Sequence, residues 1–382
     1  MVKNNYEVII VGAGISGIGC ASKLLENKYK NFKIISPDIG GRIIESESNT
    51  VEYGAYYVMD LYHNTQALVK KGRKLKASKL NFHKYNHSYK VLSKKLFTHT
   101  FQFIKLILIL KKFKKHYEKF KKKTLYHSQI NSLMEDEYLW SLYNTNARDF
   151  VLKKGVKNVV YDFIAEVLHG TAFTPIDELN AFTFLHFSLP LITPIPEFIF
   201  RKKEIKKILS KNLIKDEVVK IIKRKNNYEL ITKSKKKFSC DKIIIATPPH
   251  ISKKLLGLKD PLRKPAKAHM FHMVGEIKSS WAGEENLFSD ENRMFAIAHQ
   301  ADNSYLFYSK SKTPDFEKYF YNYKILKYKF WNPAFNIGGS NILQFKQKEQ
   351  IYLIGDNNIC GLEDAYIYGQ YAANYILGKN KD

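Results

Sequence analysis

The sequence predicts an α/β protein of two domains, one of them built on a parallel sheet. Its 382 residues exceed the roughly 100 to 200 residues of a single domain. Strand, glycine turn and helix follow one another at the N-terminus and again near the C-terminus, an alternation typical of parallel sheets covered by helices. Hydrophobic residues make up 45% and charged residues 26%, which excludes wholesale disorder and a polytopic membrane protein.

The N-terminal segment predicts a βαβ unit. Residues 7–11 (EVIIV) are a short apolar run of the buried-strand type, residues 15–27 can form a helix, and residues 32–36 (FKIIS) predict the next strand. Two parallel strands need such a crossover helix, which packs on the sheet.

Three glycines between the first strand and the helix form the pattern GxGxxG. Gly12 permits a tight turn, Gly14 lets the backbone approach a pyrophosphate, and Gly17 lets the helix pack close to the strand. The position of the pattern favours a Rossmann-type dinucleotide site over a chance glycine turn. The residues expected to bind the dinucleotide here are Gly12, Ala13, Gly14, Ile15, Ser16 and Gly17.

A ribose-binding acid is expected about 20 residues further on, at the end of the second strand. Ser36 stands at this place, and Asp38 follows two residues later. A serine hydroxyl can bind a ribose hydroxyl without the charge assistance of a carboxylate. We therefore expect weaker ribose binding through Ser36, unless Asp38 substitutes.

The C-terminal half repeats the α/β pattern. A hairpin is predicted around Asn226 and Asn227. The predicted elements are strands 217–223, 228–232, 242–246 and 351–354, and a helix at 363–377.

A basic amphipathic helix is predicted at residues 103–120. Its apolar positions share one face, and Lys105, Lys112 and Lys119 lie opposite. The apolar run is far shorter than the ~20 residues of a membrane-spanning helix, so this helix could lie on a membrane but not cross it. A second apolar stretch, residues 181–200, contains three prolines within seven residues, which predicts a pocket wall or an interfacial loop.

The net charge of +27 comes mostly from lysine, since only seven of the 63 basic residues are Arg. Arg makes the bidentate contacts that nucleic-acid readers use, so the composition argues against a nucleic-acid partner. Two interpretations of the charge stay open: coding bias in an AT-rich genome, and peripheral contact with an anionic membrane.

The cysteines and histidines predict neither a disulfide framework nor a metal site. Cys20, Cys240 and Cys360 lie far apart without a CxxC pair, and His269 and His272 lack metal-ligand companions and are interpreted as structural or surface groups. No nucleophilic catalytic set can be specified. The first strand leaves no room for a secretory signal, so we expect a cytoplasmic location.

Four segments carry recognisable motifs, and they are residues 39–42 (IGGR), 52–57 (EYGAYY), 241–249 (DKIIIATPP) and 352–377. In this order they resemble the GGR, D-x-G-A-x-W, aD-x-V-I-x-A-x-P and C-terminal flavin motifs of the flavin-containing amine oxidase superfamily. That family includes monoamine oxidases, protoporphyrinogen oxidases and phytoene-type desaturases. The resemblance implies a discontinuous FAD-binding domain of the GR2-like Rossmann type (1–85, 205–262, 330–382) and a mixed α+β substrate domain (86–204, 263–329).

The resemblance also implies which residues hold FAD. The glycine turn and Arg42 would bind the pyrophosphate, Asp356 a ribitol hydroxyl, and the Leu362 N–H the N1/O2 edge of the flavin. The further cofactor residues are Ser36, Gly41, Gly54, Ala55, Tyr56, Val218 and Gly355. The plainer alternatives are an ordinary surface ion pair for Arg42 and a helix cap or turn role for Asp356.

The implied function is an FAD-dependent oxidoreductase, whether oxidase, dehydrogenase or desaturase, that moves hydride from a substrate C–H to flavin N5. The substrate would be an amine or a lipophilic small molecule. Two departures bear on amine oxidation: Gly361 stands where amine oxidases often carry an aromatic cage residue, and Phe271 where several carry a lysine. Lys264 or Lys267 could still reach that place.

Two other functions stay open. A non-redox flavoenzyme of the UDP-galactopyranose mutase type shares the opening unit, although such enzymes usually have GGN where this chain has Gly40, Gly41 and Arg42. The second is a catalytically degenerate binding protein that keeps the FAD fold without turnover. The sequence does not predict the catalytic residues.

Overall fold

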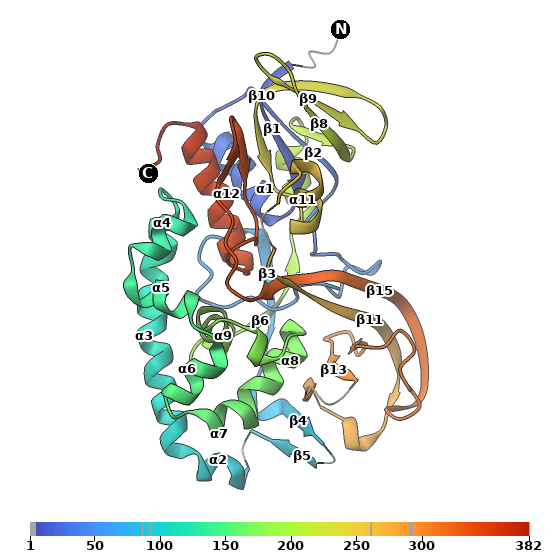
Figure 1. The fold of residues 1–382 in the computed structure, drawn as a ribbon. Coiled ribbons are helices and arrows are strands. Elements are labelled where there is room, and N and C mark those ends of the chain that lie inside the picture. The colour runs from blue at the N-terminus through green and yellow to red at the C-terminus, as the bar shows by residue number, and fades with distance from the viewer. Residues whose placement is uncertain are drawn as a thin grey trace.

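The computed structural model describes residues 5–85, 87–91, 93–259, 262–283, 285–289 and 293–381. One sheet forms the upper half of the molecule in Figure 1, in the strand order β16-β17-β10-β1-β2-β7, with the hairpin β8–β9 attached through β10. Its strands are β1 (Asn5–Ala13), β2 (Phe32–Ile39), β7 (Leu213–Lys215), β8 (Val218–Lys223), β9 (Tyr228–Thr232), β10 (Lys237–Ile245), β16 (Lys346–Lys348) and β17 (Ile351–Leu353).

The centre of this sheet is the predicted βαβ unit. β1 pairs in parallel with both β2 and β10, so that Ile10 lies between Ile34 and Ile244. All three side chains are fully buried, which explains why the strands are continuous apolar runs. The predicted strands, the β8–β9 hairpin and the helices α1 (Ile15–Glu26) and α12 (Leu362–Ile376) are confirmed.

Helices α1 and α12 pack so closely that glycine is required at their contact. A Cβ at Gly369 of α12 would lie 1.9 Å from the Ser16 carbonyl oxygen, and one at Gly19 of α1 would lie 2.4 Å from the Tyr366 carbonyl oxygen. The backbones therefore touch, and the N-terminal turn and the C-terminal motif lie side by side (Figure 1).

The second sheet has the order β15-β11-β14-β13-β12-β4-β5. Its strands are β4 (Leu80–Lys84), β5 (His87–Lys90), β11 (Lys264–Ile277), β12 (Glu285–Phe288), β13 (Met294–His299), β14 (Tyr305–Ser309) and β15 (Phe320–Gly338), and a separate pair is formed by β3 (Val69–Lys74) and β6 (Pro196–Phe200). β4 lies in this sheet although it precedes the predicted boundary at residue 85, and β15 runs across the boundary at 330. The division into two domains stays a prediction.

Helices cover the flank of the second sheet (Figure 1). They are α2 (Lys94–Thr98), α3 (Thr100–Thr124), α4 (Gln129–Met134), α5 (Glu137–Asn144), α6 (Ala147–Lys153), α7 (Lys157–Val159), α8 (Ala165–Ala172) and α9 (Ala181–Ser188), while α10 (Lys202–Leu209) and α11 (Pro249–Leu256) accompany the first sheet. None of the described helices is long and apolar enough to span a bilayer.

The amphipathic helix is confirmed as α3, but its apolar face lies inside the protein. Leu106, Leu110 and Phe113 are fully buried in the core. This face is therefore closed to a membrane. Residues 181–200, predicted as a pocket wall or an interfacial loop, form α9, a 3-10 turn and β6, and they are largely buried. Because most of this segment is a helix and a strand packed in the core, with α9 ending before Pro190, the interfacial-loop interpretation is wrong.

A Cβ at the helix contact tests this packing. We expect Gly369→Ala to lower the free energy of unfolding by about 3 kcal/mol, because the carbonyl of Ser16 belongs to rigid backbone that cannot give way. Gly72→Ala is the matched control, since its Cβ would meet only ordinary contacts at 3.6 Å. Chemical denaturation of both variants measures the difference, and equal stabilities would contradict the close approach of α1 and α12.

Candidate functional site

The turn after β1 leaves open space at one glycine only. Gly12 has φ +104°, and its Cβ would lie 2.8 Å from the Ala246 carbonyl oxygen, while a Cβ at Gly17 would lie 2.0 Å from the Gly12 oxygen. At Gly14, the residue that precedes α1, a Cβ would meet nothing closer than 3.9 Å. Gly12 and Gly17 serve the turn itself, and Gly14 faces the space in front of the helix N-terminus.

A second glycine loop, after β2, closes on the first. Gly41 is exposed and has φ +65°, and a Cβ there would lie 3.1 Å from the Cα of Gly14. Arg42 follows, and its Nη2 lies 2.6 Å from Oδ2 of Asp356. Its Nη1 donates to the carbonyl oxygen of Ala334 at 2.8 Å. The loop thus places a guanidinium beside the glycine turn.

The Arg42–Asp356 pair differs from an ordinary surface ion pair and from a helix cap, while Asp356 also lies in a bend of the chain. The Asp356 side chain is only 9% exposed, so the pair is no ordinary surface contact. Asp356 does not cap α12, whose N-cap residue is Gly361. Burial lowers the pKa of Arg42, but the charge of Asp356 outweighs it and raises the pKa overall.

The C-terminal motif also reaches the start of α1, beside the glycine turn. Gly355 has φ +117°, and a Cβ there would lie 3.7 Å from the Ser16 hydroxyl oxygen. Three segments distant in sequence, residues 12–17, 40–42 and 355–356, therefore converge at the start of α1.

The two candidate ribose residues both lie in the last half of β2 and differ in exposure and in partners. Ser36 is buried and its hydroxyl donates to the Asp38 carbonyl oxygen at 2.6 Å. The Asp38 carboxylate points to Lys202 at 2.7 Å, and 70% of its side chain is exposed. Val218 is buried in the same core cluster as Val11 and Ile35. Asp38 is thus the residue nearer the strand end, and Ser36 is the more buried of the two.

The segment after the second glycine loop runs against Arg42. A Cβ at Gly54 would lie 1.7 Å from the Arg42 carbonyl oxygen and 3.4 Å from the ring of Trp331. The following residues, Ala55 and Tyr56, are half-buried. Only glycine fits at position 54.

An aromatic wall continues from this segment into the second sheet. It consists of Tyr56, Phe173, Phe187, Tyr308 and Phe335. Tyr56 stacks on Tyr308 with a centroid distance of 6.4 Å, Phe173 lies 5.2 Å from Tyr308 and 6.0 Å from Phe335, and Phe187 lies 6.2 Å from Phe335. Four of the five rings are half-buried, so they form a wall rather than the centre of a core. Sequence analysis names Tyr56 among the cofactor residues, whereas Phe173, Phe187 and Tyr308 carry no local pattern that would predict them.

A pocket of about 290 Å³ adjoins the wall at Phe173. Its rim carries Lys264, Lys267 and Lys310. Lys264 pairs with Glu178 at 2.6 Å, and Phe271 lies in a separate core cluster of the second sheet. The two lysines considered as replacements therefore lie at this pocket.

The start of α12 holds a buried polar cluster that sequence reasoning also missed. The Tyr117 hydroxyl donates to Oδ2 of Asp364 at 2.8 Å, and His186 Nε2 lies 3.7 Å from the same oxygen and 3.3 Å from the Tyr62 hydroxyl. A Cβ at Gly361 would lie 2.4 Å from Oδ2 of Asp364, so a side chain there would require the Asp364 carboxyl group to shift.

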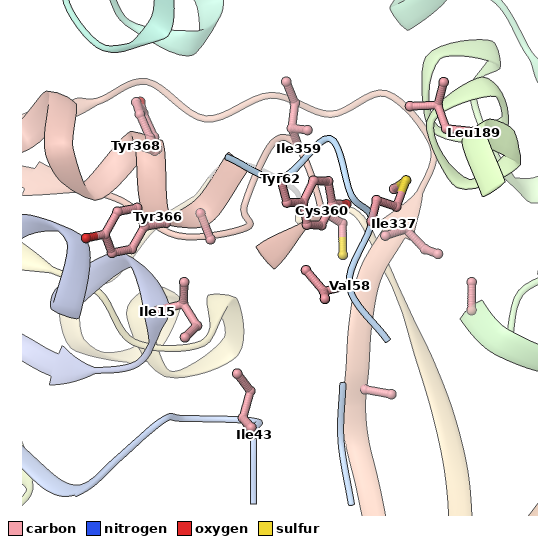
Figure 2. Packing of buried hydrophobic residues seen from close by; sticks show 14 of the residues in the cluster. Ile15, Ile43, Val58, Tyr62, Leu189, Ile337, Ile359, Cys360, Tyr366 and Tyr368 are labelled. Carbon is pink, nitrogen blue, oxygen red and sulfur yellow. The ribbon is translucent and has the colours of Figure 1, made fainter. Parts of the chain in front are cut away.

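Burial decides the protonation of this cluster. It raises the pKa of Asp364 to about 7 and lowers the pKa of His186 to about 3. The imidazole is therefore neutral at neutral pH, and its contact with Asp364 is no ion pair. Figure 2 shows Tyr62 beside Cys360, among the apolar side chains that remove water from this end of α12.

The neighbouring Glu363 fixes the loop that follows the Gly54 segment. It is fully buried, and its carboxylate accepts four hydrogen bonds of 2.8–3.0 Å from the backbone and side chains of Asn64 and Thr65. These bonds satisfy the charge of Glu363 and hold residues 60–65 against α12.

Comparison with known proteins gives structural matches alone, since neither a family model nor a curated protein sequence matches the chain. A putrescine oxidase redesigned in its cofactor binding has a TM-score of 0.67 and 11% identity, with 98% of this chain and 100% of that chain covered. A CLA-producing fatty acid isomerase from P. acnes has a TM-score of 0.68 and 12% identity, with 98% of this chain and 99% of that chain covered. A cyclohexylamine oxidase from Brevibacterium oxydans IH-35A has a TM-score of 0.63 and 12% identity, with 98% of this chain and 99% of that chain covered.

These proteins belong to the flavin amine oxidase superfamily. The chain therefore has the fold of that superfamily over nearly its whole length. The neighbours include an isomerase beside the oxidases, so the shared fold does not fix one reaction.

The raised pKa of Asp364 predicts a pH-dependent stability. Ionising this carboxyl costs more in the folded than in the unfolded chain, so stability falls as pH rises from about 4 to about 7. Asp364→Asn removes this dependence and keeps an acceptor for Tyr117. As pH rises over this range, we expect the free energy of unfolding of the variant to increase by about 2 to 4 kcal/mol relative to that of the native chain.

The comparison is a pair of denaturation series from pH 4.5 to pH 8. Burial also raises the pKa of Glu52 to about 7, so only the difference between the two proteins reports on Asp364. Parallel curves would show that Asp364 is ionised throughout and would contradict the dry cluster.

Proposed function

We propose that the chain is an FAD-dependent oxidoreductase of the amine oxidase or desaturase type, acting on a small molecule. The observation that carries the proposal is the convergence of three glycine-bearing segments and the Arg42–Asp356 pair at the N-terminus of α1. An elongated anionic cofactor needs such a site, with backbone N–H groups and a cation at one end and a flat apolar surface at the other.

The residues fit this cofactor. Gly14 and Gly41 present bare backbone where a pyrophosphate would lie, and Arg42 supplies a partial countercharge. Ser36 would bind the ribose and Asp356 the ribitol. The turn residues Ala13, Ile15 and Ser16, together with Gly355 and Val218, would shape the site around them.

The other end of the site would receive the ring system. Gly54 has no side chain, and Ala55 and Tyr56 lead from it into the aromatic wall. The N-terminus of α12 begins at Leu362, whose N–H would favour negative charge on the ring. When bound, FAD supplies the hydride acceptor at N5. The aromatic wall would hold an apolar substrate beside it and exclude water.

The remaining predictions concern location and partners. A cytoplasmic location and contact with an anionic membrane stay predictions, and the apolar face of α3 is buried and cannot make that contact. The substrate stays unspecified between amines and lipophilic molecules. A mutase-like flavoenzyme and a degenerate binding protein stay as rivals.

Gly14 offers the sharpest test of cofactor binding. Its Cβ would meet only ordinary contacts, so Gly14→Ala and Gly14→Glu should both fold, as circular dichroism and thermal melting would check. We expect Gly14→Glu to weaken FAD binding by about 100-fold, because it puts bulk and negative charge against the pyrophosphate, and Gly14→Ala to weaken it by about tenfold or less. Titration with FAD, followed by flavin absorption and fluorescence, measures both. Equal binding by the native chain and Gly14→Glu would contradict the site.

The same spectra separate the rival functions. Anaerobic dithionite should bleach the bound flavin. Rapid return of the bands in air supports an oxidase, and slow return a dehydrogenase or desaturase with another acceptor. Saturable UDP binding would favour the mutase-like enzyme. A folded chain that takes up no FAD would favour the binding protein.

A further inference from the structure

The corner of α2 and α3 exposes a row of large apolar side chains. Phe97 of α2 is 78% exposed, and Phe101, Ile104 and Leu108 of α3 are 90%, 52% and 60% exposed. The three α3 residues are three and four positions apart and share one helix face. We refer to these four residues as the exposed stripe.

The exposed stripe lies on well-anchored backbone. Residues on the opposite side of α3 are fully buried, as described for Leu106 and Leu110. Oε1 of Gln102 accepts hydrogen bonds from the backbone N–H groups of Asn158 and Val159 at 3.0 and 3.3 Å. The helix therefore holds the stripe outward as part of the fold.

The chain segment that carries the exposed stripe has acidic residues only as partners from other elements. Residues 94–117 contain seven lysines and neither Asp nor Glu. The exposed lysines of this segment are Lys94, Lys105, Lys111, Lys112 and Lys115. The acid beside the corner, Asp162, is engaged with Lys95 and His99, both at 2.9 Å.

We propose that the exposed stripe docks the protein on a membrane that carries anionic lipid. The four apolar side chains would enter the boundary between headgroups and acyl chains, and the lysines would contact the headgroups. Contact between two copies would set the seven lysines of one chain against those of the other, so charge disfavours a second copy as the occupant. The docking face is thus the opposite side of α3 from the one that sequence periodicity indicates.

A second exposed apolar region provides the matched control. On β15, an edge strand, Tyr321 and Leu326 are 66% and 46% exposed, and three lysines stand in the same stretch, at 324, 327 and 329. Lysines on an edge strand oppose pairing with another chain, which accounts for this region without a partner. Removing apolar surface there should leave membrane binding unchanged.

The test is flotation of the full-length protein with vesicles of phosphatidylcholine alone or mixed with phosphatidylglycerol. We expect binding to the mixed vesicles to be at least about tenfold stronger, and to weaken in 0.5 M salt. Phe101→Ser/Leu108→Ser should lose about tenfold or more of this binding with an unchanged melting temperature, and Lys111→Glu/Lys115→Glu should lose the preference for anionic vesicles. Tyr321→Ser/Leu326→Ser should bind as the native chain does.

Four results of the flotation experiment would overturn the proposal. They are no binding of the native chain to vesicles, equal binding of the native chain to both vesicle types, binding by Phe101→Ser/Leu108→Ser as strong as that of the native chain, and a loss of binding in the β15 control as large as in that variant. Light scattering tests whether a second copy of the chain occupies the stripe. A dimer that Phe101→Ser/Leu108→Ser abolishes would also overturn the proposal and would assign the stripe to self-association. Binding of FAD does not enter any of these measurements.

Discussion

The contact between the first and the last helix is the constraint on which the candidate site depends. α1 and α12 touch through backbone, because Gly19 and Gly369 remove the side chains that would hold them apart. The parallel pairing of β17 with β10 brings Gly355 and Asp356 to the same edge of the sheet as the glycine turn, where the helix contact lies beside them. There the carboxylate of Asp356 meets Arg42, and the segments that form the site share one place.

Buried polar groups then fix what the helix contact brings together. The Arg263 side chain is 2% exposed and donates to the carbonyl oxygens of Ile337, Gly339 and Asn358, which ties the end of β15 to the loop before α12. Glu363 ties the same loop region to Asn64 and Thr65. Each group has several partners, so removing one would leave a buried charge partly unsatisfied. Arg263 thus joins the second sheet to the segment before α12, and Glu363 joins α12 to the loop at Asn64 and Thr65.

Sequence reasoning found the parts of the site that depend on local backbone geometry. Gly12 and Gly17 belong to the pattern because the turn itself requires them, Gly14 lies between them on open space, and Arg42 follows its own glycine loop. It missed Phe173, Phe187 and Tyr308, since they come from separate elements and meet only in the folded chain. In α3, periodicity correctly predicted the helix and one apolar face. It did not show that this face is buried while Phe101 and Leu108 stay exposed, because that depends on what packs against the helix.

The same distinction explains how far the structural likeness extends to chemistry. A cradle made of backbone atoms needs glycines at a few positions and tolerates almost any other sequence, so 11% identity is compatible with a TM-score of 0.67 over 98% of the chain. The reacting end of such a site depends on side chains. Here a side chain at position 361 would displace the carboxyl group of Asp364, and the polar cluster of Tyr62, Tyr117 and His186 is built around that carboxyl group. The cofactor end and the reacting end of this fold can therefore diverge independently, and the reaction has to be argued from the α12 end and the aromatic wall.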